Sequence, residues 1–477
     1  MLLWAAAATL AVNEARADAI SIWGDNQLGQ LGDGTQNDRP TPGSVTGCSS
    51  GVTAVAAGEG YSLAVQNGAA YGWGDNTTGQ LGDGTSERRL LPVAVSAPLT
   101  SGVTAVAAGV SHSLAVQNGG VYAWGYNGNG ALGDGTTNSS TTPVAVSAPL
   151  TSGVTAIAAG NQFSLAIKNG GAWAWGVNDI GELGNGTIGS TPNPTPVAVA
   201  SLLSGVTAIA AGLRNSLAVQ NGGVYAWGNN VAGQLGDGTT TIRTTPIPVL
   251  GLANGVTAVA AGYYHSLAVR NGGVYSWGAN FDGDLGDGTT TNHITPAQID
   301  LADLHNIIAV AAGYSSSYAL SSDGSLWDWG NNGSGELGLG TFTDHYLTPQ
   351  HLLPPSGYRF TSIDAEPFAF NFAIETLATV PGPGDYNNNG VVDAADYVAW
   401  RKGLGTTYTQ NDYNVWRSHF GPPAGSGAGA TVNAAIPEPA SCVLLGLSTG
   451  GLFVMARRCR RHRSQVDCLR RFGCSPN

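Results

Sequence analysis

A repeat of about 51 residues restricts the possible folds of this chain more than any other feature. A complete copy contains V-T-A-V-A-A-G or a close variant, then S-L-A-V, Asn-Gly, V-Y-A-W-G and, after a Thr/Pro-rich stretch, a fourth segment such as P-V-A-V. These segments are short, rich in β-branched and aromatic residues, and separated by turn signals, which predicts four antiparallel strands per copy. The Trp-Gly pair recurs every 50 to 52 residues, at Trp23, Trp73, Trp124, Trp175, Trp227, Trp277 and Trp329.

Four antiparallel strands per repeat predict one blade of a β-propeller. With 71 Gly in 477 residues, a mainly helical chain is excluded. Trp23 has no strand segments before it, whereas residues 360–375 add an extra pair after the last Trp-Gly. We therefore predict an all-β, seven-bladed propeller over residues 20–376, closed by N- and C-terminal strands that share one blade.

The repeat resembles that of the regulator of chromosome condensation family, whose fold is a seven-bladed propeller. Family members often place His before the Ser-Leu-Ala segment, and the resemblance implies protein partners. We expect a partner, a protein or a surface glycan, to bind one propeller face through the loops around these positions. Here they hold Tyr61, His112, Phe163, Asn215, His265 and Ser316.

Catalytic motifs in the repeat region lack the context that catalysis requires. Two G-x-G-x-x-G matches, at 128–133 and 333–338, coincide with the recurring turn after Trp-Gly and are not followed by a predicted helix. Asp282, Asp284 and Asp287 cluster in one repeat, where we expect a solvated turn rather than a calcium site. We therefore expect a protein without catalytic residues.

Charge is distributed unevenly along the chain. Residues 20–376 contain 23 acidic and 8 basic residues, which argues against nucleic-acid binding. The segment after Met455 contains seven Arg and one Asp, and so belongs to a different functional element.

A second module follows a linker at 377–384. Residues 385–421 begin with D-Y-N-N-N-G-V-V-D-A-A-D, which resembles a dockerin calcium loop, and a helix-like stretch recurs at 395–405 and 411–421. We predict a small α-helical module with one calcium ion, although an Asn-rich loop capping a helical hairpin is the alternative. Oxygen ligands suit calcium, and the predicted ligands are Asp385, Asn387, Asn389, the carbonyl of Val391, and Asp396.

The C-terminal region resembles a Pro-Glu-Pro sorting signal that an exosortase processes. After a linker at 422–436, residues 437–463 combine the motif, a short apolar membrane segment and an Arg cluster, and a tail occupies 464–477. A plain membrane anchor is the alternative. The residues that carry this resemblance are Pro437, Glu438, Pro439, Arg457, Arg458, Arg460 and Arg461.

Residues 1–19 are apolar and rich in Ala, as in a signal peptide. Together these features predict an exported, non-catalytic recognition propeller of the cell envelope or outer surface, anchored transiently in the inner membrane. Two other classes stay open. The family resemblance implies guanine-nucleotide exchange, and the dockerin-like segment suggests a carbohydrate-binding or carbohydrate-active protein.

Overall fold

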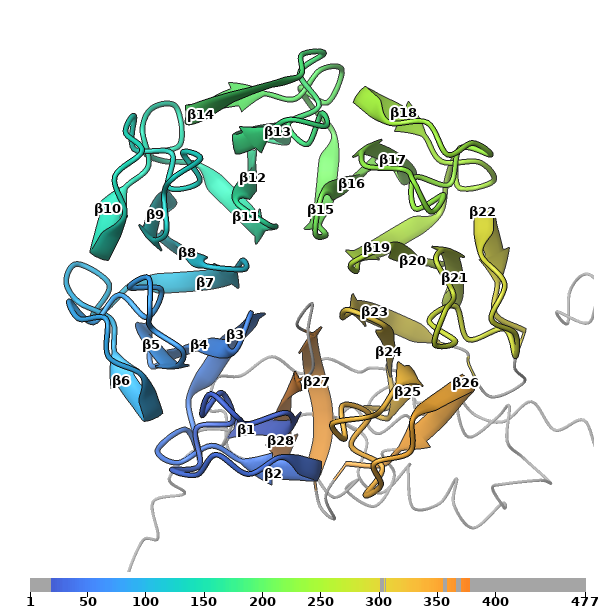
Figure 1. Ribbon diagram of the computed structural model, residues 1–477, viewed down its shortest axis with the longest axis horizontal. Helices are drawn as coiled ribbons and strands as arrows, with labels where there is room; N and C mark the ends of the chain where they lie inside the picture. Colours follow the sequence, from blue (N-terminus) through green and yellow to red (C-terminus); the bar gives the residue numbers. More distant parts are fainter. Residues whose placement is uncertain (1–18, 301–303, 305, 355–357, 366–369, 378–477) are drawn as a thin grey trace, which may run out of the picture. The chain divides into compact units, whose positions relative to one another are not determined.

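The computed structural model describes residues 19–300, 304, 306–354, 358–365 and 370–377. These residues form 28 strands in seven four-stranded antiparallel sheets, arranged as blades around a central axis (Figure 1). The prediction of an all-β, seven-bladed propeller is confirmed. Within the described ranges no helix is long and apolar enough to cross a membrane. The predicted signal peptide (except Ala19), calcium module and sorting signal lie outside the described residues.

The first two strands of each blade, counted outward from the axis, are the V-T-A-V-A and S-L-A-V segments. The innermost strands are β3 (Val52–Gly58), β7 (Val103–Ala108), β11 (Val154–Ala159), β15 (Val206–Ala211), β19 (Val256–Ala261), β23 (Ile307–Ala312) and β27 (Tyr358–Ala365). The second strands are β4 (Tyr61–Gln66), β8 (His112–Gln117), β12 (Phe163–Lys168), β16 (Asn215–Gln220), β20 (His265–Arg270), β24 (Ser316–Ser321) and β28 (Phe370–Leu377). Small Ala side chains suit the innermost strands, because the blades crowd together there.

The third strands contain Trp-Gly, and the outer strands are rich in Thr and Pro. The third strands are β5 (Ala69–Gly74), β9 (Gly120–Gly125), β13 (Gly171–Asn178), β17 (Gly223–Gly228), β21 (Gly273–Gly278), β25 (Leu326–Asn331) and β1 (Ala19–Gly24). The outer strands are β6 (Arg89–Ala94), β10 (Ser140–Ala145), β14 (Gly189–Ala198), β18 (Arg243–Pro248), β22 (His293–Gln298), β26 (His345–Leu352) and β2 (Arg39–Ser44). Pro is tolerated there because an outer strand has a free edge.

One blade is built from both ends of the described chain. Its strand order is β2-β1-β28-β27, and Trp23 of β1 pairs with Asn371 of β28. Phe360 of β27 pairs with Glu375 of β28, just as Val52 pairs with Gln66 in the β3–β6 blade. The predicted closure of the ring is therefore confirmed.

The seven Trp side chains of the Trp-Gly pairs join neighbouring blades. Each is fully buried, and its Nε1 donates a hydrogen bond to a backbone carbonyl in the preceding blade. In the β15–β18 blade, for example, Trp227 donates to the carbonyl of Glu182 at 2.8 Å. Ser216 Oγ donates to the same carbonyl at 3.1 Å. Each Trp therefore combines a large buried surface with a specific inter-blade hydrogen bond.

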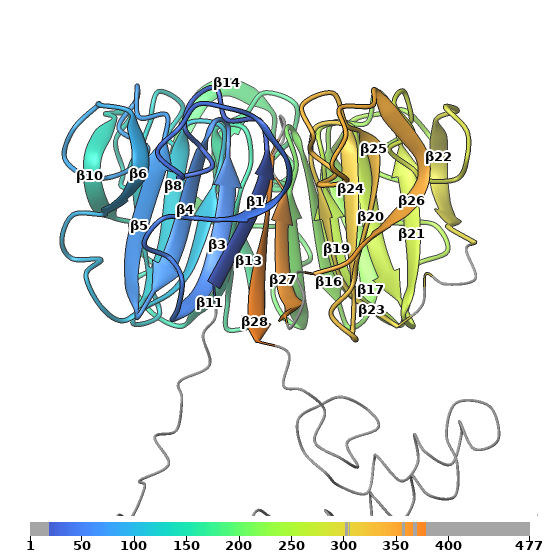
Figure 2. The same cartoon turned by 90° about the horizontal axis from the view of Figure 1, so that it is seen from below.

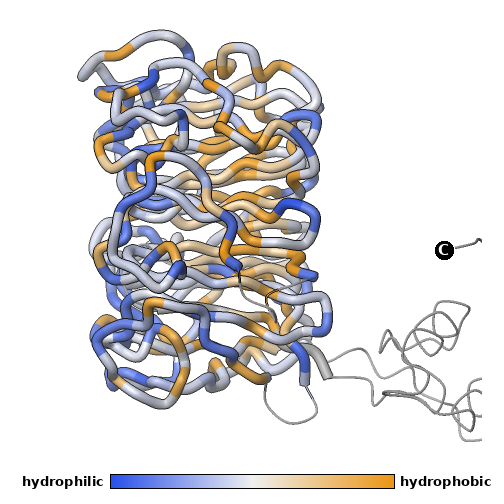
Figure 3. The backbone as a smooth tube through the Cα atoms, turned by 90° about the vertical axis from the view of Figure 1, so that its right-hand side faces the viewer, coloured by the Kyte–Doolittle hydropathy of each residue, from blue (hydrophilic) through white to orange (hydrophobic). Residues whose placement is uncertain are grey.

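The strands separate two faces of the propeller. The loop face carries the connections between first and second strands and the segments that follow Trp-Gly; it is the upper edge in Figure 2. The turn face carries the Asn-Gly turns between second and third strands, and there β1 begins and β28 ends (Figure 2). Hydrophobic residues concentrate along the strands, and most hydrophilic residues lie in the loops (Figure 3).

Candidate partner-binding face

The structure corrects the expected role of the six positions before Ser-Leu-Ala. Their side chains are 0–5% exposed, so none of them can contact a partner directly. Several join adjacent blades instead: the Tyr61 hydroxyl donates to the carbonyl of His112 at 2.6 Å. The buried positions are Tyr61, His112, Phe163, Asn215, His265 and Ser316.

The two histidines are structural groups in the blade interfaces. His112 Nε2 lies 2.9 Å from Ser164 Oγ, and His265 Nε2 lies 2.9 Å from Ser317 Oγ, each in the following blade. Burial lowers the pKa of both imidazoles to about 4. Both imidazole rings are therefore neutral near pH 7, and both belong to the buried core.

The loops next to these buried positions do reach the surface, and three of their residues form an aromatic cluster. The rings of Tyr263 and Tyr264 have centroids 4.4 Å apart, and those of Tyr263 and Tyr314 have centroids 4.3 Å apart. Tyr263 and Tyr264 connect β19 to β20, whereas Tyr314 connects β23 to β24. The cluster therefore bridges two blades on the loop face, and Tyr314 is 42% exposed.

Two further apolar side chains extend this surface along the loop face. Val231 and Phe281 are 62% and 64% exposed. In the repeat they occupy the position of Asp179, whose side chain contacts Arg214 in the next blade. Each therefore lies at a blade boundary, toward the next loop of the ring. We call Val231, Tyr263, Tyr264, Phe281 and Tyr314 the aromatic patch.

The loop face around the patch is acidic. The described connections of the loop face contain two Lys or Arg residues, Arg88 and Arg214, over the ranges 25–38, 59–60, 75–88, 109–111, 126–139, 160–162, 179–188, 212–214, 229–242, 262–264, 279–292, 313–315 and 332–344. The same connections carry 16 acidic residues, among them Asp25, Glu59, Asp75, Asp179 and Asp282. The loop face therefore has a negative potential that favours a cationic partner.

Arg214 is already engaged with carboxylates of the preceding blade. Its Nε donates to Glu182 Oε1 at 3.0 Å, and its guanidinium also pairs with Asp179. Burial raises the pKa of Glu182 to about 7, although the neighbouring Arg214 opposes this rise. The pairing compensates a buried carboxyl group and leaves little positive charge for a ligand.

The predicted solvated turn at Asp282, Asp284 and Asp287 is only partly correct. Asp284 is 2% exposed, and burial, together with the charge of Asp282, raises its pKa to about 7. Asp287 accepts hydrogen bonds from Thr289 within the turn. Among the described residues no group of three or more His, Cys, Asp or Glu is arranged to hold a metal ion.

The other predicted site residues lie beyond the part of the chain that the structure describes. They are the calcium ligands Asp385, Asn387, Asn389, Val391 and Asp396, and the sorting residues Pro437, Glu438, Pro439, Arg457, Arg458, Arg460 and Arg461.

The repeat pattern did not indicate the aromatic patch, because the pattern consists of what the repeats share. The patch lies where the repeats differ: the position of Tyr263 holds Glu59, Val110, Asn161 or Leu213 in other blades. The available signal was a loop position that varies among the other repeats but holds Tyr in two adjacent blades, as Tyr263 and Tyr314.

Comparison with known proteins agrees with this architecture. Residues 6–369 match the family described as RCC1-like domain. A segment of 245 residues is 30% identical to the ultraviolet-B receptor UVR8 of Arabidopsis thaliana, covering 50% of this chain and 55% of UVR8. The mitochondrial RCC1 domain-containing protein RUG3 of the same plant is 30% identical over 260 residues, covering 52% of this chain and 46% of RUG3. The chain thus spans about half the length of these curated relatives.

Solved structures share the fold at low sequence identity. Human WBSCR16 superposes with a TM-score of 0.66 at 24% identity, covering 75% of this chain and 99% of that one. Yeast RCC1 (Prp20), solved with Kap60 bound, superposes with a TM-score of 0.66 at 23% identity, covering 76% of this chain and 90% of Prp20. The family match covers most of the chain, and the blade count and ring closure agree with it. The chain belongs to the RCC1-like domain family.

Proposed function

We propose that this protein is a non-catalytic recognition propeller that binds a basic protein surface through the loop face. The observation that carries the proposal is the aromatic patch beside loops in which carboxylates far outnumber Lys and Arg, and in which Arg214 is paired within the propeller. Its physical basis is the combination of exposed apolar area with unneutralised carboxylates.

The chemistry of the patch is that of a binding hot spot. Tyr is enriched among the interface residues that dominate affinity. Because its side chain has few rotamers, it loses little conformational entropy when a partner covers it. Tyr faces also attract Lys and Arg side chains by cation–π contacts of about 0.5–2 kcal/mol. The surrounding carboxylates of Glu59 and Asp282 would steer a cationic partner toward the patch and raise its association rate.

Affinity capture with matched variants tests this function. The wild-type propeller and the double variant Tyr263→Ser/Tyr314→Ser would each be used to capture proteins from a cell-envelope extract, with quantification by mass spectrometry. Leu203→Ser is the control, because Leu203 is 66% exposed but lies in the β14–β15 connection of the turn face. A partner should be retained by the wild type and the control, lost by the double variant, and released by salt. Equal capture by all three proteins would reject the proposal.

We further propose that the protein is exported and processed at its C-terminus, with the propeller on the outer side of the inner membrane. Support comes from the apolar N-terminal segment and from the order of Pro437-Glu438-Pro439, apolar run and Arg cluster. The calcium loop at 385–396 would then serve a separate C-terminal module with one bound ion. Intact-mass measurement of the native protein tests processing: a mature chain that retains the Arg-rich peptides of 457–471 would leave only the plain anchor.

A further inference from the structure

Two blade boundaries on the loop face hold an acidic residue in the same backbone position. The backbone carbonyl of Glu182 accepts hydrogen bonds from a serine hydroxyl and a Trp-Gly indole of the next blade, at 3.1 and 2.8 Å. Two blades later, the carbonyl of Asp284 accepts hydrogen bonds from Ser317 Oγ and Trp329 Nε1, at 2.8 and 2.9 Å. Glu182 and Asp284 therefore present their side chains to the next blade from equivalent positions.

The residue opposite each acid is also held in the same way. The carbonyl of Arg214 accepts a hydrogen bond from the backbone N–H of Asn229 at 2.9 Å, and the carbonyl of Ser315 accepts one from that of Asn331 at 2.7 Å. Each of the two residues directly precedes the second strand of its blade, β16 or β24. Ser315 is therefore the counterpart of Arg214.

The second boundary keeps the acid of the pair but not the base. At the first boundary the guanidinium group of Arg214 pairs with Glu182 at 3.0 Å and also with Asp179. At the second, Asp284 is opposite the short side chain of Ser315, and no Lys, Arg or His of the described chain forms an ion pair with it. The Arg214 side chain is 30% exposed and covers Glu182, so this position admits a guanidinium group from the loop face.

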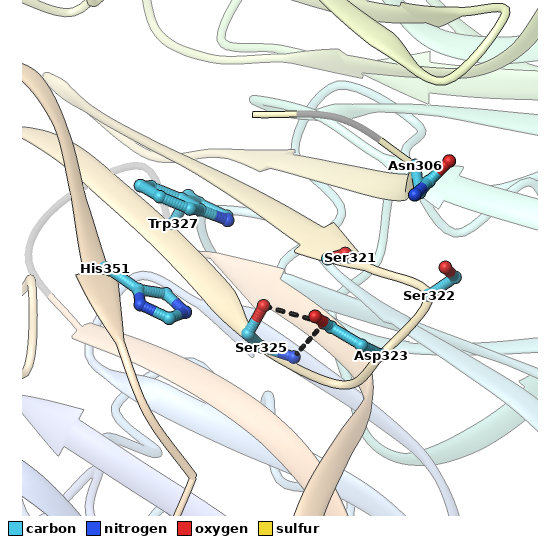
Figure 4. Close-up of a pocket in the computed structure, with 7 residues that line it drawn as sticks. All are labelled: Asn306, Ser321, Ser322, Asp323, Ser325, Trp327 and His351. Carbon is cyan, nitrogen blue, oxygen red and sulfur yellow. Dashed lines mark hydrogen bonds between the residues drawn. The ribbon is translucent and has the colours of Figure 1, made fainter. Parts of the chain in front are cut away.

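The carboxyl group of Asp284 is buried with an oxygen that lacks a donor. Asp284 is 2% exposed, and its Oδ1 has no hydrogen-bond partner among the described residues. By contrast, Asp323, which lines the turn-face pocket in Figure 4, accepts hydrogen bonds from the backbone N–H and Oγ of Ser325, at 2.9 and 2.7 Å. A carboxylate oxygen buried without a donor destabilises the fold, and a donor from outside the chain would relieve this.

The surroundings of Asp284 favour a planar cation. Burial, together with the charge of Asp282, raises the pKa of Asp284 to about 7, and Asp282 adds a second carboxylate two residues away. Phe281 and Tyr314, which are 64% and 42% exposed, supply aromatic rings from the two blades that meet at this boundary. A guanidinium group stacks on aromatic rings and donates paired hydrogen bonds to a carboxylate, which distinguishes it from an ammonium ion.

We propose that Asp282, Asp284 and Ser315 form an anchor site for one arginine side chain of the basic partner. The arginine would supply the guanidinium group that Arg214 supplies within the chain, with Phe281 and Tyr314 against the apolar part of its side chain. The inference rests on the proposed function, because it names the chemical group that the loop face binds.

Ser315→Arg tests the geometry of the anchor site without a partner, because it restores the base of the pair. The variant should raise the melting temperature at pH 8, where Asp284 is largely ionised. The gain should be absent when the same substitution is made together with Asp284→Asn; amides are compatible with this position, which holds Gln30 and Gln80 in other blades. Ser315→Gln is the matched control, because Gln162 occupies the position in another blade, and it should bring no gain.

Calorimetric titration with acetyl-Gly-Arg-Gly-amide tests binding from outside the chain, with the peptide containing neutral citrulline as the control ligand. At pH 8 the full-length protein should bind the arginine peptide at one site, at least tenfold more tightly than the citrulline peptide. Asp284→Asn should weaken binding at least tenfold, and so should Ser315→Arg, whose own guanidinium group would occupy the site. Asp75→Asn removes one loop-face carboxylate from another blade and should bind like the wild type.

The outcomes separate this inference from the proposed function. No binding of the arginine peptide to the wild type, unchanged binding in Asp284→Asn and Ser315→Arg, or no Asp284-dependent gain in Ser315→Arg would overturn the anchor site. In the affinity capture, Asp284→Asn should retain at least tenfold less partner than the wild type. Capture at the wild-type level would also overturn the anchor site, whereas the proposed function fails only if Tyr263→Ser/Tyr314→Ser keeps the partner.

Discussion

The indole Nε1 of Trp23 donates a 2.7 Å hydrogen bond to the backbone carbonyl of Glu336, which lies 313 residues later in the chain. Both groups are buried, and the Trp23 ring packs with Leu337, Phe360 and Ala373 in the core beside the closing blade. The contact has the same form as the six other Trp–carbonyl contacts, but it joins the two ends of the ring. Closure therefore depends on a residue near the start of the described chain.

Substitutions of Trp23 should measure how much this contact contributes to closure. Trp23→Ala removes a fully buried indole and should lower the free energy of unfolding by about 3–5 kcal/mol. Trp23→Phe keeps an aromatic ring but removes the donor, so we expect a smaller loss of about 1–2 kcal/mol. Urea denaturation followed by circular dichroism gives both values. If Trp23→Ala were as stable as the wild type, β1 would not hold the ring closed.

The glycine of the recurring turn should be intolerant of substitution because an indole from the next blade packs on it. A Cβ on Gly184 would lie 2.7 Å from Trp227 Nε1, and Gly184 has φ of 62°. Gly184→Ala should therefore lower the free energy of unfolding by more than the roughly 1 kcal/mol expected from backbone conformation alone. Gly251 is the control, because it has φ of 76° but no atom within 4 Å of an added Cβ. Equal melting temperatures of the two variants would show that the indole contact is unimportant.

The Arg214–Glu182 pair should show strong coupling between neighbouring blades. Arg214→Met leaves the carboxyl of Glu182, which is 0% exposed, without its cation and should destabilise the protein by about 1–3 kcal/mol at pH 8. Glu182→Gln should recover most of that loss in the double variant, because Gln30 and Gln80 occupy this position in other blades. A double-mutant cycle in urea denaturation measures the coupling. Additive effects of the two substitutions would contradict it.

Asp328 should make the propeller less stable as pH rises. Its carboxyl group is fully buried in β25, neither oxygen has a hydrogen-bond partner among the described residues, and burial raises its pKa well above the usual value. A carboxyl group with a raised folded-state pKa favours folding only at low pH, and that contribution disappears as pH rises from about 4 through the folded pKa. Glu182 and Asp284, with pKa values of about 7, act in the same direction.

Asp328→Ala tests this pH dependence. Other blades hold Ala in this position, as at Ala226, so the smaller side chain is compatible with the fold. We expect the variant to be more stable than the wild type by about 1–3 kcal/mol at pH 8, the usual penalty for a buried unsatisfied group. The difference should shrink at pH 4.5, as measured by melting temperature. A gain that did not depend on pH would mean that packing, and not ionisation, is responsible.

The fold was predictable because its determinants recur seven times. The spacing of Trp23 to Trp329 indicated the blades, and the extra strand pair at 360–375 indicated closure. The Asn-Gly turns also form as expected, with φ of 51° at Asn67 and 77° at Gly68. Each of these features depends on local backbone conformation or on a residue type that recurs in register.

The proposed binding surface was not predictable in the same way. His112 and His265 recur at a family position, but a single sequence does not show that they are enclosed between two blades. The role proposed for Tyr314 arises from its contact with Tyr263 of a different blade. Such contacts involve residues that differ between the repeats. Only the three-dimensional structure shows which of these residues lie next to one another.

Amide hydrogen exchange of the full-length protein, with and without the captured partner, shows which face of the propeller the partner covers. We expect the partner to slow exchange at residues 263–264, 279–283 and 314–315, and to leave the turn-face segment 321–325 unchanged. Protection confined to the turn face, with the aromatic patch exchanging at its free rate, would show that the loop face does not bind the partner.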